Sequence, residues 1–170
     1  MSRDLEDEDF IIGQLYADEM VNETPVIAKR VEKIPHGHKN PLGLTYSAED
    51  NLDLYEAVNT WLGVPYKYGG EDRNGIDCSA FVRAIYQEVY HVTLSRTCNE
   101  MFQSVTVVDK SRIKEGDLVF FTNSNGKVSH VGIYLKEDLF AHSSTSNGVS
   151  VSRLDDSYWK KHFYKGGRVK

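Results

Sequence analysis

The stretch Asp77-Cys78-Ser79 opens a segment whose apolar residues recur at helical spacing, at Phe81, Ala84, Ile85 and Val89. Aspartate is a favoured N-cap, so the pattern predicts a helix with Cys78 in its first turn. Backbone N–H groups at a helix start carry partial positive charge and favour a thiolate. The stretch therefore predicts an exposed cysteine nucleophile on a helix that is otherwise buried.

Two histidines downstream, His130 and His142, lie in strand-like sequence. Side chains alternate along a strand, so His130 is predicted to share a face with Val128, Gly132 and Tyr134, opposite the face that carries Val131, Ile133 and Leu135. Gly132 leaves room for a close neighbour. A helix bearing Cys78 laid across the His130 face would bring sulfur and imidazole together.

The remaining pattern predicts the fold class. Ser47 and Asp50 resemble a capping box that starts a first helix, which Gly63 ends, and the segment 97–100 has the same signature. Short β-type runs follow at 105–108, 118–121, 128–135, 139–142 and 149–152, separated by turn residues. Helices followed by strands indicate an α+β domain, with N-terminal helices packed on a C-terminal antiparallel meander.

Length and composition set the domain plan. The 170 residues fit one domain, predicted at 47–170, preceded by an arm or linker at 1–46 that contains the Pro/Gly/His segment 35–43. His36 and His38 lack partners at metal-ligand spacing, so a metal site there is not favoured. The net charge of −5 argues against nucleic acid as a partner. The basic C-terminus is interpreted as a solvated edge, at Lys160, Lys161, Lys165, Arg168 and Lys170.

Two cysteines do not make a disulfide framework, so Cys98 is predicted to be a small buried hydrophobe beside the reactive Cys78. The sequence holds no apolar run long enough to span a bilayer. Residues 1–9 are acidic where a secretory signal is basic and then apolar. The expectation is a cytoplasmic protein or an exported one whose leader has been removed.

Five motifs in this order and spacing resemble the NlpC family of bacterial cell-wall cysteine peptidases: 63–70, 75–79, 116–121, 129–134 and 140–143. The resemblance covers 47 to about 169, with Tyr158-Trp159 near its end. It implies a circularly rearranged papain-like fold that cleaves peptidoglycan stem peptides in the cell envelope, commonly between D-glutamate and the following diamino acid, without metal or organic cofactor. It also implies site residues: Cys78 as nucleophile, His130 as base, His142 as its orienter, Tyr66 lining the site, and Asp77 and Ser79 as structural or substrate-binding neighbours.

The sequence departs from the family pattern at Ala80 and within the stretch 94–98. Ala80 stands where glycine is usual, and modest repacking is expected. The stretch Leu94-Ser95-Arg96-Thr97-Cys98 stands where the family often has Leu-Pro-Arg-Thr-Ser, which bears on substrate contacts there.

Three alternatives stay open. Cys78, His130 and His142 are residue types that can ligate zinc, although such a site would lack an obvious base. A catalytically silent wall-binding module could keep the groove. An amidase or acyltransferase could use the same thioester, because a thioester serves any acceptor. The oligomeric state is not predicted.

Overall fold

The helices precede most of the strands, as the α+β prediction requires. The computed structural model describes residues 42–47 and 49–170, so most of the predicted arm, including His36 and His38, lies outside the described residues. The elements in chain order are α3 (Leu52–Trp61), β1 (Glu71–Asp72), β2 (Gly75–Ile76), α4 (Cys78–Tyr90), α5 (Cys98–Ser104), β3 (Thr106–Val108), the 3-10 turn η1 (Lys110–Arg112), β4 (Leu118–Thr122), β5 (Val128–Tyr134), β6 (Leu139–Ser144), β7 (Gly148–Arg153), α6 (Ser157–His162) and β8 (Phe163–Arg168).

Capping residues explain where the helices begin. The Asp77 side chain accepts from the Ala80 N–H at 2.8 Å, so α4 starts at Cys78 as predicted. Thr97 closes a capping box with Glu100 ahead of α5. The first helix starts later than predicted: Ser47 and Asp50 form a turn, and Asn51 caps α3.

The six-stranded sheet has the order β3-β8-β4-β5-β6-β7, with every neighbouring pair antiparallel. The predicted meander is β4 to β7. The basic C-terminal side chains are solvated as predicted, with Lys165 half-buried and the other four exposed, although β8 itself lies inside the sheet between β3 and β4. The sequence does not predict this strand because Gly166 and Gly167 interrupt its strand pattern. The structure nevertheless favours glycine at 167, since a Cβ there would lie only 2.5 Å from Val105 and 2.8 Å from the Phe120 ring.

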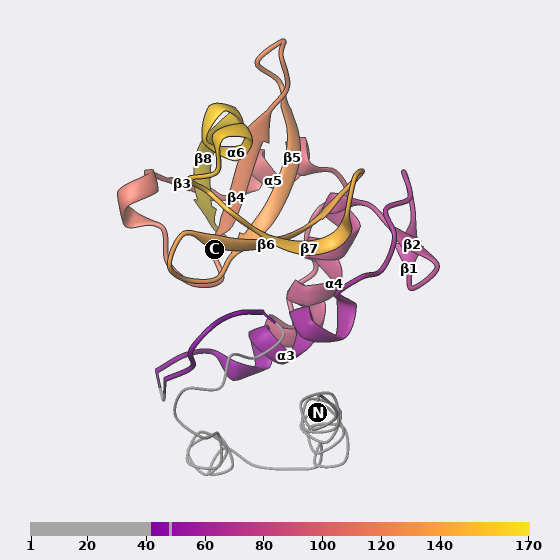
Figure 1. The fold of residues 1–170 in the computed structure, drawn as a ribbon. Helices are drawn as coiled ribbons and strands as arrows, with labels where there is room; N and C mark the ends of the chain where they lie inside the picture. Colours follow the sequence, from indigo (N-terminus) through magenta and orange to yellow (C-terminus); the bar gives the residue numbers. More distant parts are fainter. Residues whose placement is uncertain (1–41, 48) are drawn as a thin grey trace, which may run out of the picture.

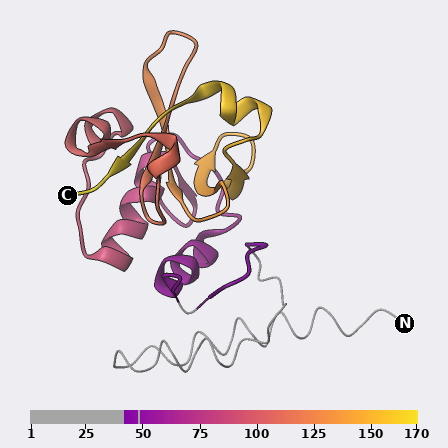
Figure 2. The ribbon, with the colours of Figure 1, turned by 90° about the vertical axis from the view of Figure 1, so that its left-hand side faces the viewer.

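Helices α3, α4 and α5 lie on one side of the sheet, whereas Trp159 of α6 packs against the cluster on the other side (Figures 1 and 2). Phe81 and Ile85 of α4 share the main core with Val131 and Ile133 of β5. The helix therefore covers the aliphatic face of β5, and the prediction that it crosses the His130 face is wrong. An apolar helix stripe buries more area against valine and isoleucine than against an imidazole face.

A β-bulge beside His130 changes the predicted phase of β5. Phe121 pairs with His130, but Thr122 pairs with Val128, so Ser129 is the extra residue. As a result Val128 packs against the same core as Val131 and Ile133 instead of sharing the His130 face. Tyr134 keeps the predicted phase and packs against the second cluster, on the other side of the sheet.

Residues just before the predicted domain start are also packed. Leu42 is 6% exposed and Leu44 is fully buried, and both belong to the main core. The boundary at 47 remains a prediction, but the packed part of the chain extends at least to Leu42.

Candidate active site

Cys78 occupies the first position of α4, at the end of a segment that is tied to the sheet. The Ser143 hydroxyl on β6 donates to the Ile76 carbonyl at 2.8 Å. Gly63 N–H donates to the Val149 carbonyl and Val149 N–H to the Val64 carbonyl, both at 2.9 Å, so β7 holds the start of the same segment. The sulfur is thus fixed relative to β6 and β7.

Cys78 is only 9% exposed, so the prediction of an exposed nucleophile is wrong. Burial raises the pKa of its thiol to about 12, with smaller contributions from Cys98 and Asp77, although N–H groups of Val131 and Ser79 act in the opposite direction. The helix start alone would favour a thiolate; here burial outweighs it. The resting sulfur is a neutral thiol.

The two predicted histidines meet. His130 Nε2 lies 2.9 Å from His142 Nδ1, and the other nitrogen of His142, Nε2, lies 2.8 Å from Ser152 Oγ. Gly132 makes this approach possible, because a Cβ there would lie 2.8 Å from both the Ala141 carbonyl oxygen and the Phe140 ring. The predicted close neighbour of Gly132 is thus β6.

Aromatic side chains enclose the histidine pair. Trp159 of α6 stacks on His130 with ring centroids 5.3 Å apart and meets His142 edge-on at 4.7 Å. Phe121 and Phe140 pack against the same group. Burial lowers the pKa of His130 to about 4, and burial and then His130 lower that of His142 to about 3. Both rings are neutral at physiological pH.

The sulfur lies close to β5 at the residue next to His130, since the Val131 N–H acts to lower the pKa of the Cys78 thiol. The described residues include no hydrogen bond from Cys78 Sγ to His130. His130 Nε2 is engaged by His142, which leaves Nδ1 as the nitrogen that can serve the thiol. The arrangement can act as a neutral thiol–imidazole pair.

Asp77 and Ser79 do not face the histidine pair but join an ionic network. Arg96 donates to both oxygens of Asp77, at 3.1 and 2.7 Å, and to Ser79 Oγ at 2.9 Å. Burial alone would raise the pKa of Asp77, but hydrogen bonds from Arg96 and the Ala80 N–H bring it below its usual value. The Arg96 Nε lies 2.7 Å from Glu71. Arg96 therefore braces the cysteine turn.

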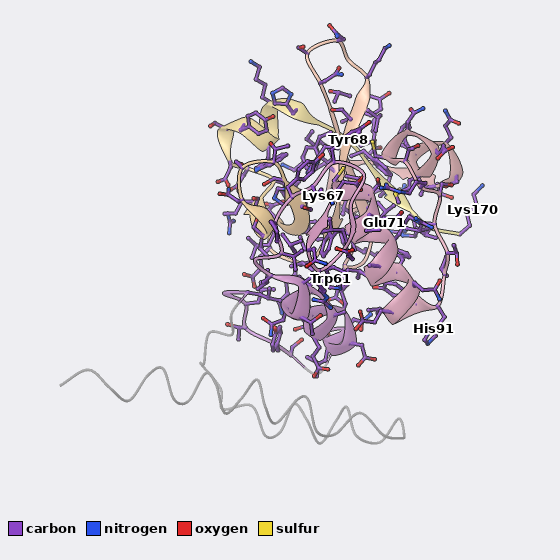
Figure 3. The ribbon with its side chains drawn as sticks, turned by 90° about the vertical axis from the view of Figure 1, so that its right-hand side faces the viewer. Trp61, Lys67, Tyr68, Glu71, His91 and Lys170 are labelled. Atoms are coloured by element: carbon purple, nitrogen blue, oxygen red, sulfur yellow. The ribbon has the colours of Figure 1, made fainter. Side chains whose placement is uncertain are left out.

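Tyr66, which was predicted to line the site, lies next to Ile76 and close to Cys78. It forms an isolated parallel bridge with Ile76, and burial followed by the proximity of Cys78 raises the pKa of its phenol. Figure 3 shows its neighbours Lys67 and Tyr68 above Trp61, on the same side of the molecule as Glu71. Tyr68 is 89% exposed. This segment thus borders the sulfur and is open to solvent on its outer side.

Sequence reasoning missed three residues of the site. Ser152 lies two residues beyond Ser150, which pairs with His142 across β6 and β7. The sequence alone does not give the register of this strand pair, so it could not place Ser152 beside His142. Trp159 stood only as a motif residue near the C-terminus, and Arg96 only as part of a substrate-contact stretch. The other cysteine, Cys98, is free and half-buried, and its thiol lies 3.8 Å from the Val128 carbonyl.

The zinc alternative loses support from His142, because both of its ring nitrogens have protein partners. Among residues 42–47 and 49–170 there is also no group of three or more His, Cys, Asp or Glu residues that could hold a metal ion. Within the same part of the chain, no helix has the length and apolar character to cross a membrane.

Comparisons with known proteins agree with this fold and give the family. The model of the NlpC/P60 family matches residues 63–168. The chain is 39% identical over 116 residues to the "Probable endopeptidase NlpC homolog" of Haemophilus influenzae, covering 68% of this chain and only 61% of that protein. It is 32% identical over 154 residues to "Murein DD-endopeptidase MepS/Murein LD-carboxypeptidase" of Escherichia coli K12, covering 90% of this chain and 81% of that protein. A solved NlpC/P60 protein from Bacillus cereus superposes with a TM-score of 0.64 at 28% identity, covering 68% of this chain and 39% of that one.

Proposed function

Because this chain belongs to the NlpC/P60 family of cell-wall cysteine peptidases, we propose that it is an endopeptidase that hydrolyses peptidoglycan stem peptides in the cell envelope. The observation that carries the proposal is the contact between His130 Nε2 and His142 Nδ1, next to Val131, whose N–H acts on the Cys78 thiol at the start of α4. A binding module has no need for a nucleophile, a base and an orienter in one place.

In this mechanism the resting enzyme holds a neutral thiol and two neutral imidazoles. His130 Nδ1 takes the proton from Cys78 as the sulfur attacks the amide carbonyl, and His142 accepts a hydrogen bond from His130 Nε2–H. The proton then passes to the leaving amine. Water, deprotonated by His130, hydrolyses the thioester and restores the thiol.

The oxyanion is stabilised at the helix start. Asp77 engages the Ala80 N–H with its side chain and the Phe81 N–H with its carbonyl, whereas the Cys78 N–H has no hydrogen-bond partner among the described residues. That N–H is the first oxyanion donor, and the Tyr66 hydroxyl is the second, each contributing about 3 kcal/mol to transition-state stabilisation.

Two bonds are candidates for cleavage. The motif resemblance points to the bond between D-glutamate and the diamino acid. A relative that aligns with 90% of this chain is named both a murein DD-endopeptidase and a murein LD-carboxypeptidase, and the first name favours a bond between two D-configured residues as the second candidate. An amine or alcohol acceptor in place of water would make the enzyme a transferase with the same thioester.

The test is mass spectrometry of the products formed from purified peptidoglycan and from defined stem peptides. Wild-type enzyme should release stem fragments whose masses identify the bond and the acceptor. Cys78→Ala should abolish release while the protein remains folded by circular dichroism. Cys98→Ala is the matched control and should digest at the wild-type rate; undiminished digestion by Cys78→Ala would reject the role given to the sulfur.

A further inference from the structure

Ser152 is the end of a hydrogen-bonded line that runs from His130 through His142. Its hydroxyl lies 2.8 Å from His142 Nε2, and His142 Nδ1 lies 2.9 Å from His130 Nε2. His142 sits on β6 and Ser152 on β7, and the cross-strand pairs Phe140–Ser152 and His142–Ser150 place them diagonally on one face.

The line has two self-consistent proton arrangements. If Ser152 donates to His142 Nε2, the proton of His142 is on Nδ1 and donates to His130 Nε2, so the proton of His130 sits on Nδ1, the nitrogen that the mechanism assigns to the thiol. If Ser152 accepts from His142 Nε2–H, both histidines carry their protons on Nε2. His130 Nε2–H then donates to His142 Nδ1, and His130 Nδ1 presents a lone pair. Only the second arrangement lets His130 act as the base.

The same arrangement is required once the proton has been transferred. His130 is then an imidazolium whose Nε2–H needs an acceptor, and in this enclosed site that acceptor is His142 Nδ1. His142 must therefore carry its own proton on Nε2, where an unpaired N–H would be costly to bury. A hydroxyl can act either as donor or as acceptor. Ser152 can therefore accept from His142 while its own O–H donates a hydrogen bond to water, because the residue is only half-buried.

We propose that Ser152 is a positioning residue that accepts the Nε2–H of His142 and so fixes the tautomer of both histidines in the form that leaves His130 Nδ1 free to take the thiol proton. This inference rests on the proposed function for its kinetic consequences, but the tautomer itself can be observed without any activity. No charged side chain of the described residues shifts the pKa of either ring. Burial lowers the pKa of both histidines, and the proximity of His130 lowers that of His142 further.

The kinetic test compares Ser152→Ala, Ser152→Thr and Ser150→Ala. Ser150 is the matched control because it lies on the same strand and face, pairs with His142 and bonds only to the Gly148 carbonyl. Ser152→Ala should lower kcat about tenfold with KM changed less than about twofold, the size of one lost hydrogen bond. Ser152→Thr, which keeps the hydroxyl and suits a strand, should restore kcat to within about twofold. Ser150→Ala should match wild type.

The pH–rate profile separates this role from a structural one. Without its terminal acceptor the imidazolium is less stable, so the limb that reports the imidazole pair should move to lower pH in Ser152→Ala and return in Ser152→Thr. A loss of kcat with an unmoved limb, a threonine variant that fails to recover while melting at the wild-type temperature, or an equal effect of Ser150→Ala would each overturn the proposal.

A direct test uses nitrogen-15 NMR of the histidines in the Cys78→Ala protein, which keeps Ser152 and needs no turnover. His142 should be protonated at Nε2 and bare at Nδ1, and introducing Ser152→Ala should shift the population toward the Nδ1–H form. A His142 protonated at Nδ1 in the Cys78→Ala protein would refute the inference even if peptidase activity were established. Conversely, the expected tautomer in a protein that digests no peptidoglycan would uphold the positioning role and reject the proposed substrate.

Discussion

At the residue scale, the site is decided by the difference between the two histidines. His130 has one ring nitrogen left for the sulfur, whereas both nitrogens of His142 are occupied. Their types and order were readable from the sequence. Their contact could not be read from the sequence with the same ease, because it depends on the absence of a side chain at Gly132 and on the register between β5 and β6.

This difference predicts unequal losses on substitution. His130→Ala removes the base and should reduce kcat by about 10²- to 10⁴-fold. His142→Ala removes only the group that orients and supports the base, so its loss should be smaller. Steady-state kinetics on one defined stem peptide, with melting temperatures as the check on folding, decides the matter. Equal and complete losses would contradict the division of roles.

At the element scale, the short helix α6 controls the surroundings of both rings. Its Trp159 stacks on His130 and meets His142, while its neighbour Tyr158 is 61% exposed. The sequence showed an aromatic pair here but not that α6 folds back onto the ends of β4 and β5. That placement follows from β8, which enters the middle of the sheet directly after α6.

Trp159→Ala should move the imidazole limb of the pH–rate profile to higher pH by about one unit. Burial holds the pKa of both histidines below 6.5, and removing the indole admits water, which favours the charged rings. The shift is opposite in sign to that expected for Ser152→Ala. Tyr158→Ala serves as the control and should leave the limb in place; a downward shift in Trp159→Ala would contradict burial as the cause.

At the scale of the whole molecule, the helical layer and the sheet share one core that reaches back to Leu42. The order of helices before strands predicted this two-layer plan correctly. Alternation correctly placed Val131 and Ile133 opposite His130, but it did not determine which of these two faces the helices cover; the bulge at Ser129 changed only the phase of Val128. Nor could alternation reveal β8, where two glycines replace the expected apolar residues.

Because the core reaches back to Leu42, we predict that Leu44→Ala destabilises the 170-residue chain. Leu44 is fully buried, so truncation should lower the free energy of unfolding by about 3 kcal/mol through lost burial and a residual cavity. The adjacent Thr45 is exposed, and Thr45→Ala should change stability by less than about 0.5 kcal/mol. Urea unfolding of the three proteins measures both values. Equal midpoints for Leu44→Ala and wild type would show that the core begins later in the chain.

The near-complete covering of the Cys78 sulfur has a consequence for inhibitor chemistry. Cys98 is the more accessible of the two thiols, since it is half-buried while Cys78 is 9% exposed. Large electrophiles will accordingly modify Cys98 first, and the number of alkylated cysteines will overstate inactivation. A warhead for this protein has to be slender and carried on a peptide that opens the way to the sulfur, so that selectivity comes from the carrier and not from thiol reactivity.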